Sequence, residues 1–473
     1  MTLADLVVVA NRLPVDRVSD ADGGDGWRRS PGGLVTALEP VMRREDGAWV
    51  GWPGQPDLEV EPFEFEGTHL VPVALSADEV ENYYEGFSND TIWPLYHDVI
   101  AAPQYRRVWW EAYVRVNRRF AEAAASVAAE GATVWVQDYQ LQLVPQLLRT
   151  ARPDLTIGYF HHIPFPAYGL YSQLPWRRQV LEGLLGADVI GFQRVTDASN
   201  FARAVRRQLR YETKATGIRV PDADGTTRLA LAKAFPISID ATSYADLARR
   251  PDIRARAAEI REGLGNPHTV FLGVDRLDYT KGIRHRLKAF GEILEDGRLG
   301  VENATLVQVA SPSRERVESY IQLRDEIELM VGRINGDHDT VGHTAIRYLH
   351  QAFPREEMVA LFLAADVMLV TALRDGMNLV AKEYVASRID NRGVLILSEF
   401  AGAADELGSA VRINPHDIDG LKDAMMRAAE MPAAEQGRRM RALRRKVIEN
   451  DISAWSASFL AALDAVRTQK DAR

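Results

Sequence analysis

The chain has 473 residues, of which 46% are hydrophobic and 26% are charged, and it carries a formal net charge of −9 and no cysteine. A chain of this size can bury a large core in two or three domains, and the lack of cysteine excludes disulfides, thiolate metal sites and a cysteine nucleophile. The acidic balance argues against general binding to nucleic acid or to an anionic membrane, so a few placed arginines and lysines must hold any anionic substrate.

The first predicted element is a strand in the segment MTLADLVVVANR, whose apolar run covers residues 6–10. This run is too short for the hydrophobic region of a signal peptide or for a membrane span, and no basic segment precedes it. We therefore expect a cytoplasmic protein that has neither a membrane nor a nucleic acid as its partner.

Further short apolar runs alternate with amphipathic stretches along the chain. Such runs are typical of parallel strands buried on both faces, and the stretches between them are typical of covering helices. The series is interrupted between 211 and 230, where a turn and a hairpin are indicated. We therefore predict an α/β fold with two doubly wound halves that face each other across a cleft. The later strands are predicted at 133–137, 156–160, 189–192, 269–274, 304–310, 366–372 and 394–398, and helices at 105–130, 176–187, 243–263 and 356–365.

Residues that directly follow predicted strands are the candidate site residues, because ligands of doubly wound sheets bind beyond the carboxyl ends of the strands. Arg12 follows the first strand, and an adjacent glycine pair after it would let a ligand approach the backbone. Trp52, Tyr84 and Trp93 lie among Gly, Asn and Pro, outside any helical apolar period. This pattern predicts loops whose rings either pack against sugars or pin the loops to the core.

Polar side chains also follow the next two predicted strands of the first half. Asp138 comes directly after 133–137, and His161 and His162 come after 156–160. The segment IPFP then stiffens the loop, because each proline fixes its own φ and restricts the residue before it. Structural and catalytic roles are both open for these groups.

The second half presents cations and carboxylates in the same way. Arg276 and Lys281 lie on either side of a turn after a strand, where they could neutralise a diphosphate, and Arg314 follows the next strand. The segment RDGMNLVAKEY places Asp375 and Glu383 around the start of a helix, whose unpaired N–H groups favour a phosphate. A plain helix start capped by Asp375 is the alternative.

Several other function classes lack their motifs in this sequence. No G-x-G-x-x-G follows a strand, and neither a Walker-type phosphate loop nor an H-E-x-x-H segment is present, so we do not expect hydride transfer or P-loop chemistry. The acidic segments 20–22, 222–224 and 337–339 lie in glycine-containing turns, where aspartate is common. We expect no metal and no cofactor.

Eight segments of the chain, taken in order, resemble signatures of the trehalose-6-phosphate synthases, which are retaining glucosyltransferases of family 20 with the GT-B fold. These segments are NRLPV, GGL, GWPG, FSNDTIWPLYH, FHHIPFP, RLDYTKG, SPSR and RDGMNLVAKEY, and the resemblance covers the chain from about residue 5 to residue 460. The resemblance implies transfer of glucose from a nucleotide-glucose to glucose 6-phosphate, giving α,α-trehalose 6-phosphate. UDP-glucose is the donor we expect first, with ADP-glucose and GDP-glucose as alternatives.

The resemblance also implies roles for individual residues, carried over motif by motif. The residues implied in catalysis are Asp138, His162, Arg276 and Lys281. Those implied in binding glucose 6-phosphate are Arg12, Trp52, Tyr84, Trp93, Asp138 and Arg314. Those implied in binding the donor are Gly33, His162, Arg276, Lys281, Phe353, Asp375, Gly376, Met377, Asn378, Leu379 and Glu383. Gln137 and Gln140 stand where many family members have histidine, and this departure bears on how the acceptor is positioned.

The resemblance further implies an acceptor-binding domain at 1–238, a nucleotide-sugar domain at 239–450 and a C-terminal helix at 451–473 that returns to the first domain. Reaction on one face of the sugar needs no carboxylate pair, whereas double displacement needs a carboxylate beside the anomeric carbon, and the sequence leaves both open. We expect a homo-oligomer whose product passes to a separate trehalose-phosphate phosphatase.

Two other functions remain as alternatives at this stage. One is a sister glucosyltransferase that uses another phosphorylated acceptor, such as glycerol phosphate. The other is a non-catalytic regulatory subunit that binds a sugar phosphate as a signal.

Overall fold

A computed structural model describes residues 3–19, 25–30, 35, 38, 42, 47–222 and 225–471, and the chain divides into two units. The first unit joins Met1–Pro236 to Ser453–Arg473, and the second is Ile237–Ile452. The chain therefore crosses from one unit to the other twice.

The first unit is built on a ten-stranded sheet in the order β10-β11-β12-β9-β8-β7-β1-β4-β6-β5. Its strands from β12 to β6 are parallel, and antiparallel pairs close both edges. The strand order reverses between β1 and β7, because β4 and β6 extend the sheet on one side of β1 while β7, β8 and β9 extend it on the other. The strands are β1 (Ala4–Arg12), β4 (Ala48–Trp52), β5 (Phe63–Phe65), β6 (Thr68–Pro72), β7 (Ala128–Gln137), β8 (Thr156–His161), β9 (Val189–Phe192), β10 (Thr213–Lys214), β11 (Gly217–Pro221) and β12 (Thr227–Ala234), with a separate hairpin of β2 (Val15–Ser19) and β3 (Asp25–Arg29).

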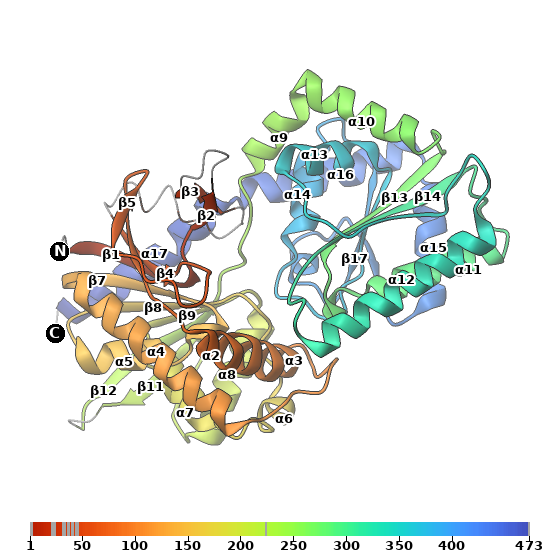
Figure 1. The fold of residues 1–473 in the computed structure, drawn as a ribbon. Helices are drawn as coiled ribbons and strands as arrows, with labels where there is room; N and C mark the ends of the chain where they lie inside the picture. Colours follow the sequence, from red (N-terminus) through yellow and green to blue (C-terminus); the bar gives the residue numbers. More distant parts are fainter. Residues whose placement is uncertain are drawn as a thin grey trace. The chain divides into compact units, whose positions relative to one another are not determined.

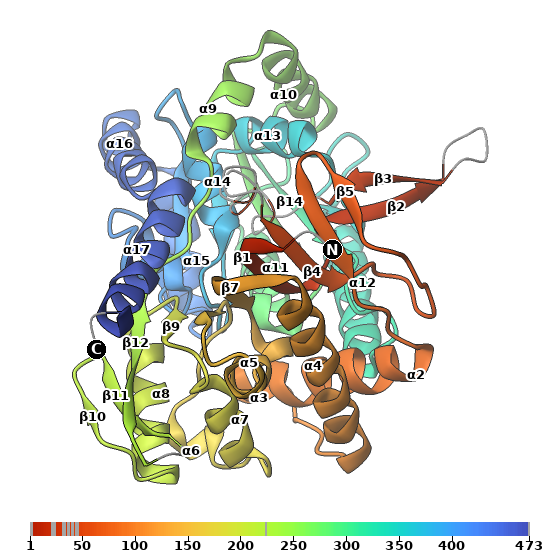
Figure 2. The ribbon, with the colours of Figure 1, turned by 90° about the vertical axis from the view of Figure 1, so that its left-hand side faces the viewer.

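The C-terminal helix α17 (Ile452–Asp471) packs on this sheet (Figure 2). Its Phe459 ring stacks on Trp135 of β7, with 4.5 Å between the ring centroids and 8° between the ring planes. A Cβ on Gly158 of β8 would lie 2.8 Å from Phe459, so the glycine lets the helix approach closely. Trp455, Phe459 and Leu463, which recur at every fourth position, are all buried.

The other helices of the first unit correct one sequence expectation. The segment around Tyr84 was expected to form loops, but residues Val80–Ile92 form a π-helix, η1. Its hydrogen bonds join residues five apart, so its buried positions do not follow the α-helical period and the pattern was misread as a loop. The helices are α2 (Ala77–Glu79), α3 (Trp93–Tyr96), α4 (Arg107–Val127), η2 (Tyr139–Leu141), α5 (Val144–Ala151), α6 (Tyr168–Tyr171), α7 (Arg177–Leu184) and α8 (Val195–Gln208).

The second unit is a doubly wound sheet with six parallel strands in the order β15-β14-β13-β16-β17-β18, covered by helices on both faces (Figure 1). Its order reverses between β13 and β16, which is where such sheets bind ligands. The strands are β13 (Thr269–Arg276), β14 (Ala304–Ser311), β15 (Ile346–Leu349), β16 (Val367–Val370), β17 (Val394–Ser398) and β18 (Val411–Ile413). The helices are α9 (Ala241–Arg249), α10 (Pro251–Gly263), η3 (Tyr279–Lys281), α11 (Ile283–Glu295), α12 (Glu318–His338), α13 (Arg355–Ala364), α14 (Leu379–Ser387), η4 (Gly402–Asp405), α15 (Ile418–Ala429) and α16 (Ala433–Glu449).

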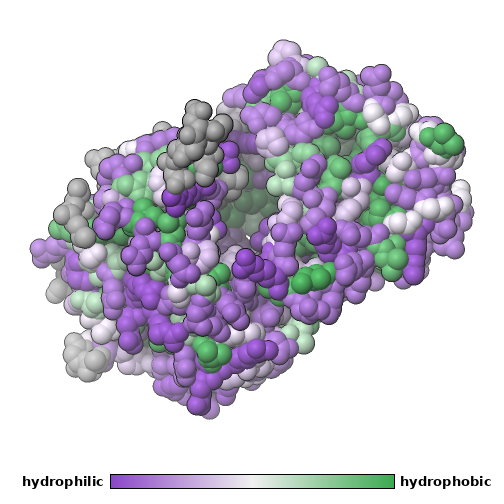
Figure 3. Space-filling view, viewed as in Figure 1, coloured by the Kyte–Doolittle hydropathy of each residue, from purple (hydrophilic) through white to green (hydrophobic). Residues whose placement is uncertain are grey.

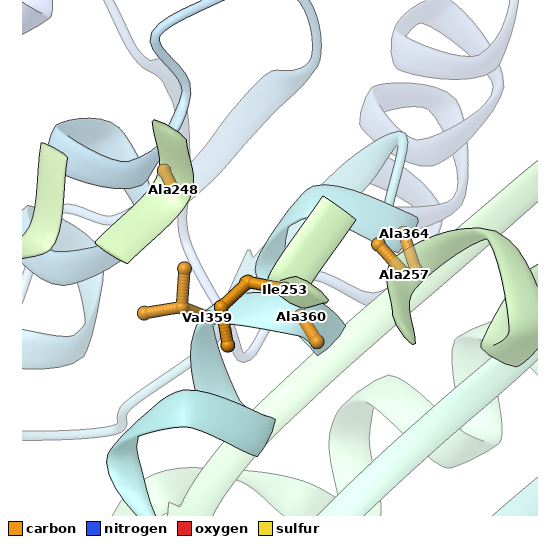
Figure 4. Close-up of a cluster of buried hydrophobic side chains, with 6 residues drawn as sticks. All are labelled: Ala248, Ile253, Ala257, Val359, Ala360 and Ala364. Atoms are coloured by element: carbon orange, nitrogen blue, oxygen red, sulfur yellow. The ribbon is translucent and has the colours of Figure 1, made fainter. Parts of the chain in front are cut away.

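The single helix predicted at 243–263 is wrong, because α9 and α10 are separate. Pro251 lacks the N–H that would continue α9, and it restricts Arg250 to an extended backbone with ψ of 132°. The two helices then pack on α13 through small buried side chains (Figure 4). This cluster consists of Ala248, Ile253, Ala257, Val359, Ala360 and Ala364.

All the strands predicted from apolar runs are present in the ten-stranded and the six-stranded sheet. No helix in the described ranges is long and apolar enough to cross a membrane. On the face shown in Figure 3, hydrophobic residues are interspersed among hydrophilic ones.

Candidate active site

The second unit brings Lys281 and Asp375 together at the reversal of its strand order. Lys281 ends η3, the turn after β13, and Asp375 follows β16. Because β13 and β16 are adjacent and parallel, the segments that follow them meet at the same edge of the sheet. Lys281 Nζ lies 2.6 Å from Asp375 Oδ2, and only 11% and 13% of the two side chains are exposed. A largely buried ion pair therefore lies where α/β proteins bind ligands.

Asn378 shapes the turn between Asp375 and α14. It adopts a left-handed backbone with φ of 73°, and its Oδ1 accepts a hydrogen bond from the Ala381 N–H at 3.1 Å. Its Nδ2 donates to Asp375 Oδ2 at 3.2 Å. Asn378 is therefore the N-cap of the helix, and Asp375 is left beside Lys281. The same turn carries three other predicted donor residues, Gly376, Met377 and Leu379.

Three of the predicted cations surround a buried carboxylate, Asp278. Its Oδ2 accepts a hydrogen bond from the Tyr320 hydroxyl at 2.9 Å. Burial alone would raise the pKa of this carboxyl group, but the positive charges of Arg314, Arg276 and Lys281 lower the pKa well below its usual range. The carboxylate is therefore ionised and keeps the three cations in one region of the second unit.

Arg314, which was predicted to bind the acceptor, belongs to this cluster. It follows β14 in the left-handed region, with φ of 51°. Its guanidinium lies 3.5 Å from Asp278 and 5.3 Å from the centroid of the Tyr320 ring. Only 5% of the side chain is exposed, so the structure fixes the group before any ligand binds.

Glu383 lies within α14, next to Tyr244 of α9 and Arg355 of α13. It is half-buried, and burial raises its pKa while the Tyr244 hydroxyl and the charge of Arg355 oppose the rise. The Arg355 guanidinium lies 4.0 Å from the centroid of the Tyr244 ring. Phe353 is half-buried just before α13. Glu383 is therefore held by neighbours and is not a solvated surface residue.

The first unit has a cavity of about 440 Å³ where its own strand order reverses, beyond β1 and β7. The ends of these two strands and η1 bring together three predicted acceptor residues, Arg12, Tyr84 and Asp138. The cavity is lined by Ala10, Asn11, Arg12, Leu13, Asp16, Ser30, Val35, Trp49, Tyr84, Gln137, Asp138 and Gln140.

Arg12 lies beside aromatic rings at this cavity. Its guanidinium is 5.2 Å from the centroid of the Trp52 ring, which is 6.1 Å from that of Tyr84. Gly54 has φ of 95°, and a Cβ at this position would lie 2.1 Å from Arg12 Nη2, so only glycine leaves room for the arginine. Arg12 also pairs with Asp16 at 3.0 Å, and 46% of its side chain is exposed. An exposed cation next to aromatic rings suits an anionic sugar.

Asp138 and His162 are joined at the carboxyl ends of β7 and β8. Asp138 has φ of 70°, and its Oδ1 accepts a hydrogen bond from the His162 N–H at 3.1 Å. His162 Nε2 lies 2.9 Å from Gln137 Oε1. Burial lowers the pKa of His162 to about 3, so the ring is neutral near pH 7 and donates its Nε2 proton to Gln137.

Trp52 and Trp93, which were predicted to bind the acceptor, are not among the residues that line the cavity. Trp93 is buried in α3, with its ring 4.1 Å from His97 and 5.7 Å from Tyr139 between centroids, and it does not line the cavity. Gly33 lies outside the residues that the structure describes.

The structure also reveals neighbours of the candidate residues that the sequence analysis missed. Asn11 lines the cavity and accepts a hydrogen bond from the Tyr83 hydroxyl at 2.8 Å, which ties β1 to η1. Asp278 could have been noticed as an acidic residue in the basic turn RLDYTKG. Tyr244 gave no signal, because its contact with Glu383 joins segments far apart in the chain.

His161, next to the site, predicts a pH dependence of stability. Its side chain is fully buried, and burial, together with His162, lowers its pKa to about 3 from an ordinary 6.5. The unfolded chain therefore binds a proton that the folded chain excludes, so stability is lost as the pH falls from 6.5 towards 3. Between pH 7 and pH 5 we expect His161→Phe to lose about 2 kcal/mol less of its unfolding free energy than the parent protein. Urea unfolding at the two pH values measures this, and equal losses would contradict it.

Comparison with known proteins agrees with this geometry. A model of glycosyltransferase family 20 matches residues 4–465. The trehalose-6-phosphate synthase of Mycolicibacterium gilvum (strain PYR-GCK) is 59% identical over 470 residues, which cover 97% of this chain and 93% of that protein.

Solved structures of similar proteins cover almost the whole chain. An α,α-trehalose-phosphate synthase (UDP-forming) from Burkholderia xenovorans in complex with glucose-6-phosphate is 34% identical, with a TM-score of 0.87 over 97% of this chain and 99% of that one. An E. coli structure described as trehalose-6-phosphate bound with UDP-2-fluoro glucose is 33% identical, with a TM-score of 0.88 over 97% and 98% of the two chains.

These similarities confirm the α/β fold of the GT-B type and the predicted family. The match extends over both units, including the ends of β1, β7, β13 and β16 where the candidate residues gather. Since the family model and the close relative both span nearly its whole length, the chain belongs to glycosyltransferase family 20, the family of the trehalose-6-phosphate synthases.

Proposed function

We propose that the first unit binds glucose 6-phosphate and the second binds a nucleotide-glucose, so that this chain carries out its family's trehalose-6-phosphate synthase reaction. The observation that carries this assignment is the pair of strand-order reversals, one in each unit. Each reversal gathers predicted substrate residues: Arg12, Tyr84 and Asp138 in the first unit, and Lys281 and Asp375 in the second.

The proposed donor site would place cations at the diphosphate and carboxylates at the two sugars of the nucleotide-glucose. Arg276 and Lys281 would neutralise the diphosphate as negative charge grows on the leaving oxygen, which is electrostatic stabilisation of the transition state. Asp375 lies 2.6 Å from Lys281, so it can reach hydroxyls of the glucose next to that diphosphate. Glu383, which lies beside Tyr244, would accept hydrogen bonds from the ribose hydroxyls.

The proposed acceptor site is the cavity of the first unit. Arg12 would bind the 6-phosphate, and Asp138 would accept a hydrogen bond from a sugar hydroxyl. Gln137 and Gln140 line the same cavity, and because amides do not titrate as histidines do, these two positions stay uncharged at every pH. Retention would occur on one face of the donor sugar, with a departing phosphate oxygen taking the acceptor's proton.

A donor panel tests this function. UDP-glucose, ADP-glucose and GDP-glucose are each mixed with glucose 6-phosphate, and nucleoside diphosphate release is measured. We propose UDP-glucose as the preferred donor, because the similar Burkholderia xenovorans enzyme is UDP-forming. A non-catalytic regulatory subunit would release no nucleoside diphosphate with any donor, and that result would refute the proposal.

We expect turnover to be unchanged in EDTA. Arg276 and Lys281 supply positive charge at the diphosphate, so a divalent cation is not needed there. Asp339, part of the acidic segment 337–339, already accepts a hydrogen bond from the Ala345 N–H at 2.7 Å. Assays with and without EDTA check this prediction. Loss of activity that Mg²⁺ restores would assign a metal to Asp337 and Asp339.

We further propose that the chain works in the cytoplasm as a homo-oligomer and that a separate trehalose-phosphate phosphatase consumes its product. Light scattering on the purified protein measures the assembly, and a monomer at working concentration would refute the homo-oligomer.

A further inference from the structure

Arg286 lies beneath the turn that carries Lys281. It belongs to α11, and its side chain is completely buried. Its guanidinium Nη2 donates to the Lys281 carbonyl at 2.9 Å, and its Nε donates to Thr371 Oγ1 at 2.8 Å. Its Nη1 donates to Gln308 Oε1 of β14 at 3.3 Å. One planar group therefore connects the turn after β13, the strand β14 and the segment after β16.

The charge of Arg286 is paired with Asp275, whose side chain is 4% exposed. Nη1 lies 2.8 Å from Asp275 Oδ2, and burial raises the pKa of Asp275 to about 6, against the pull of the arginine. Asp275 directly precedes Arg276 on β13. A buried ion pair is costly unless its geometry and hydrogen bonds are good, so this pair is weak evidence for stability alone. Through Asp275 and the Lys281 carbonyl, the Arg286 guanidinium contacts both the end of β13, which carries Arg276, and the turn that carries Lys281.

Two glycines leave the space that this arrangement needs. A Cβ on Gly273 would lie 2.3 Å from Arg286 Nη1, and a Cβ on Gly282 would lie 2.1 Å from the Thr371 carbonyl. Gly282 also has φ of 65°, which other residues adopt only with strain. The backbone around Lys281 is therefore built closely around Arg286 and Thr371.

We propose that Arg286 is a positioning residue for glucosyl transfer, which fixes Lys281 against the leaving diphosphate. This inference rests on the proposed role of Lys281. A cation contributes to the transition state only when its position is set before the reaction, and a displacement of about 1 Å can cost about 100-fold in rate. Lysine at position 286 would keep a charge but lose the planar fork that reaches all four partners at once.

The test is a double-mutant cycle on kcat, with both substrates saturating. We expect Arg286→Lys to lower kcat at least about 10-fold in the parent protein and less than about 2-fold in a Lys281→Ala background, because its effect passes through Lys281. Arg388→Lys is the control, since Arg388 is also buried in the second unit and pairs with Asp390 at 3.0 Å. It should leave kcat within about 2-fold, whatever it does to the thermal unfolding temperature.

A milder variant keeps the test decisive if Arg286→Lys fails to fold. Thr371→Val removes the acceptor of Arg286 Nε together with the hydrogen bonds that Thr371 Oγ1 donates to the Lys281 and Gly282 carbonyls at 3.3 and 3.1 Å. It therefore tests the whole support of the Lys281 turn, and we expect kcat about 5-fold lower, with no further loss in the Lys281→Ala background. Thr305→Val is its control, because the buried Thr305 donates to the Thr344 carbonyl at 2.8 Å in the same unit.

The outcomes separate this inference from the proposed function. If Arg286→Lys or Thr371→Val lowered kcat equally in the parent protein and in the Lys281→Ala background, the positioning role would be overturned. An unchanged kcat in whichever of the two variants folds would overturn it as well. Near-normal turnover of Lys281→Ala by itself would instead refute the proposed role of Lys281.

Discussion

Turnover is expected to fall by at least about 100-fold when Lys281 is replaced by alanine. This is the scale observed when one preorganised charge contact to a transition state is removed. Lys281 is 11% exposed and pairs with Asp375 at 2.6 Å, so its ammonium is already in place before the donor binds. The loss should appear mainly in kcat, because charge grows on the leaving oxygen during the reaction. Steady-state kinetics with UDP-glucose and glucose 6-phosphate measure it.

Lys422→Ala is the matched control for this substitution. Lys422 has 10% of its side chain exposed and forms ion pairs with Asp296 at 2.7 Å and Glu292 at 3.2 Å in the same unit. Its loss should change stability without a comparable loss of kcat. If Lys281→Ala kept near-normal turnover, Lys281 would be removed from the leaving-group site.

The second large effect is expected at Asp138. Replacing it with asparagine should lower kcat/KM for glucose 6-phosphate by about 100-fold, the cost of losing a charged hydrogen-bond acceptor. Asparagine tolerates the left-handed backbone at φ of 70°, so the turn should be preserved. KM for the nucleotide-glucose should change less than KM for glucose 6-phosphate, because Arg276, Lys281, Asp375 and Glu383 of the proposed donor site belong to the second unit. Initial rates over a range of glucose 6-phosphate concentrations measure this.

Asp98→Asn provides the control for the backbone. Asp98 is an exposed residue of the first unit with φ of 57°, and it does not line the cavity. Both variants should unfold at the temperature of the parent protein, while only Asp138→Asn should lose activity. An unchanged kcat/KM in Asp138→Asn would place the acceptor away from Asp138.

The strands that could be predicted from the sequence are those buried on both faces. β7 and β13 read as continuous apolar runs because helices cover both sides of their sheets. β4 was missed although all of its residues are buried, because its sequence AWVGW has a glycine in its interior and leads into the turn GWPG. β18 has only three residues, too few for any periodic pattern.

The site could be predicted in part, because residues after parallel strands must meet at one edge of the sheet. That rule correctly brought Lys281 and Asp375 together, but it could not identify their neighbours. Arg286 lies in the basic stretch IRHRLK, which reads as a solvated helix surface, and only packing shows that it is buried. Trp93, in contrast, was predicted to bind the acceptor but is buried, because a loop aromatic and a buried aromatic share the same local sequence features.

Identification of the acceptor and the product tests most directly the claim that this chain forms trehalose 6-phosphate. The protein is incubated with UDP-glucose and, in parallel, glucose 6-phosphate or glycerol phosphate, and the products are identified by NMR. We predict release of nucleoside diphosphate together with a non-reducing disaccharide phosphate, α,α-trehalose 6-phosphate, from glucose 6-phosphate alone. Transfer to glycerol phosphate in its place, or nucleoside diphosphate release without a disaccharide, would contradict the account.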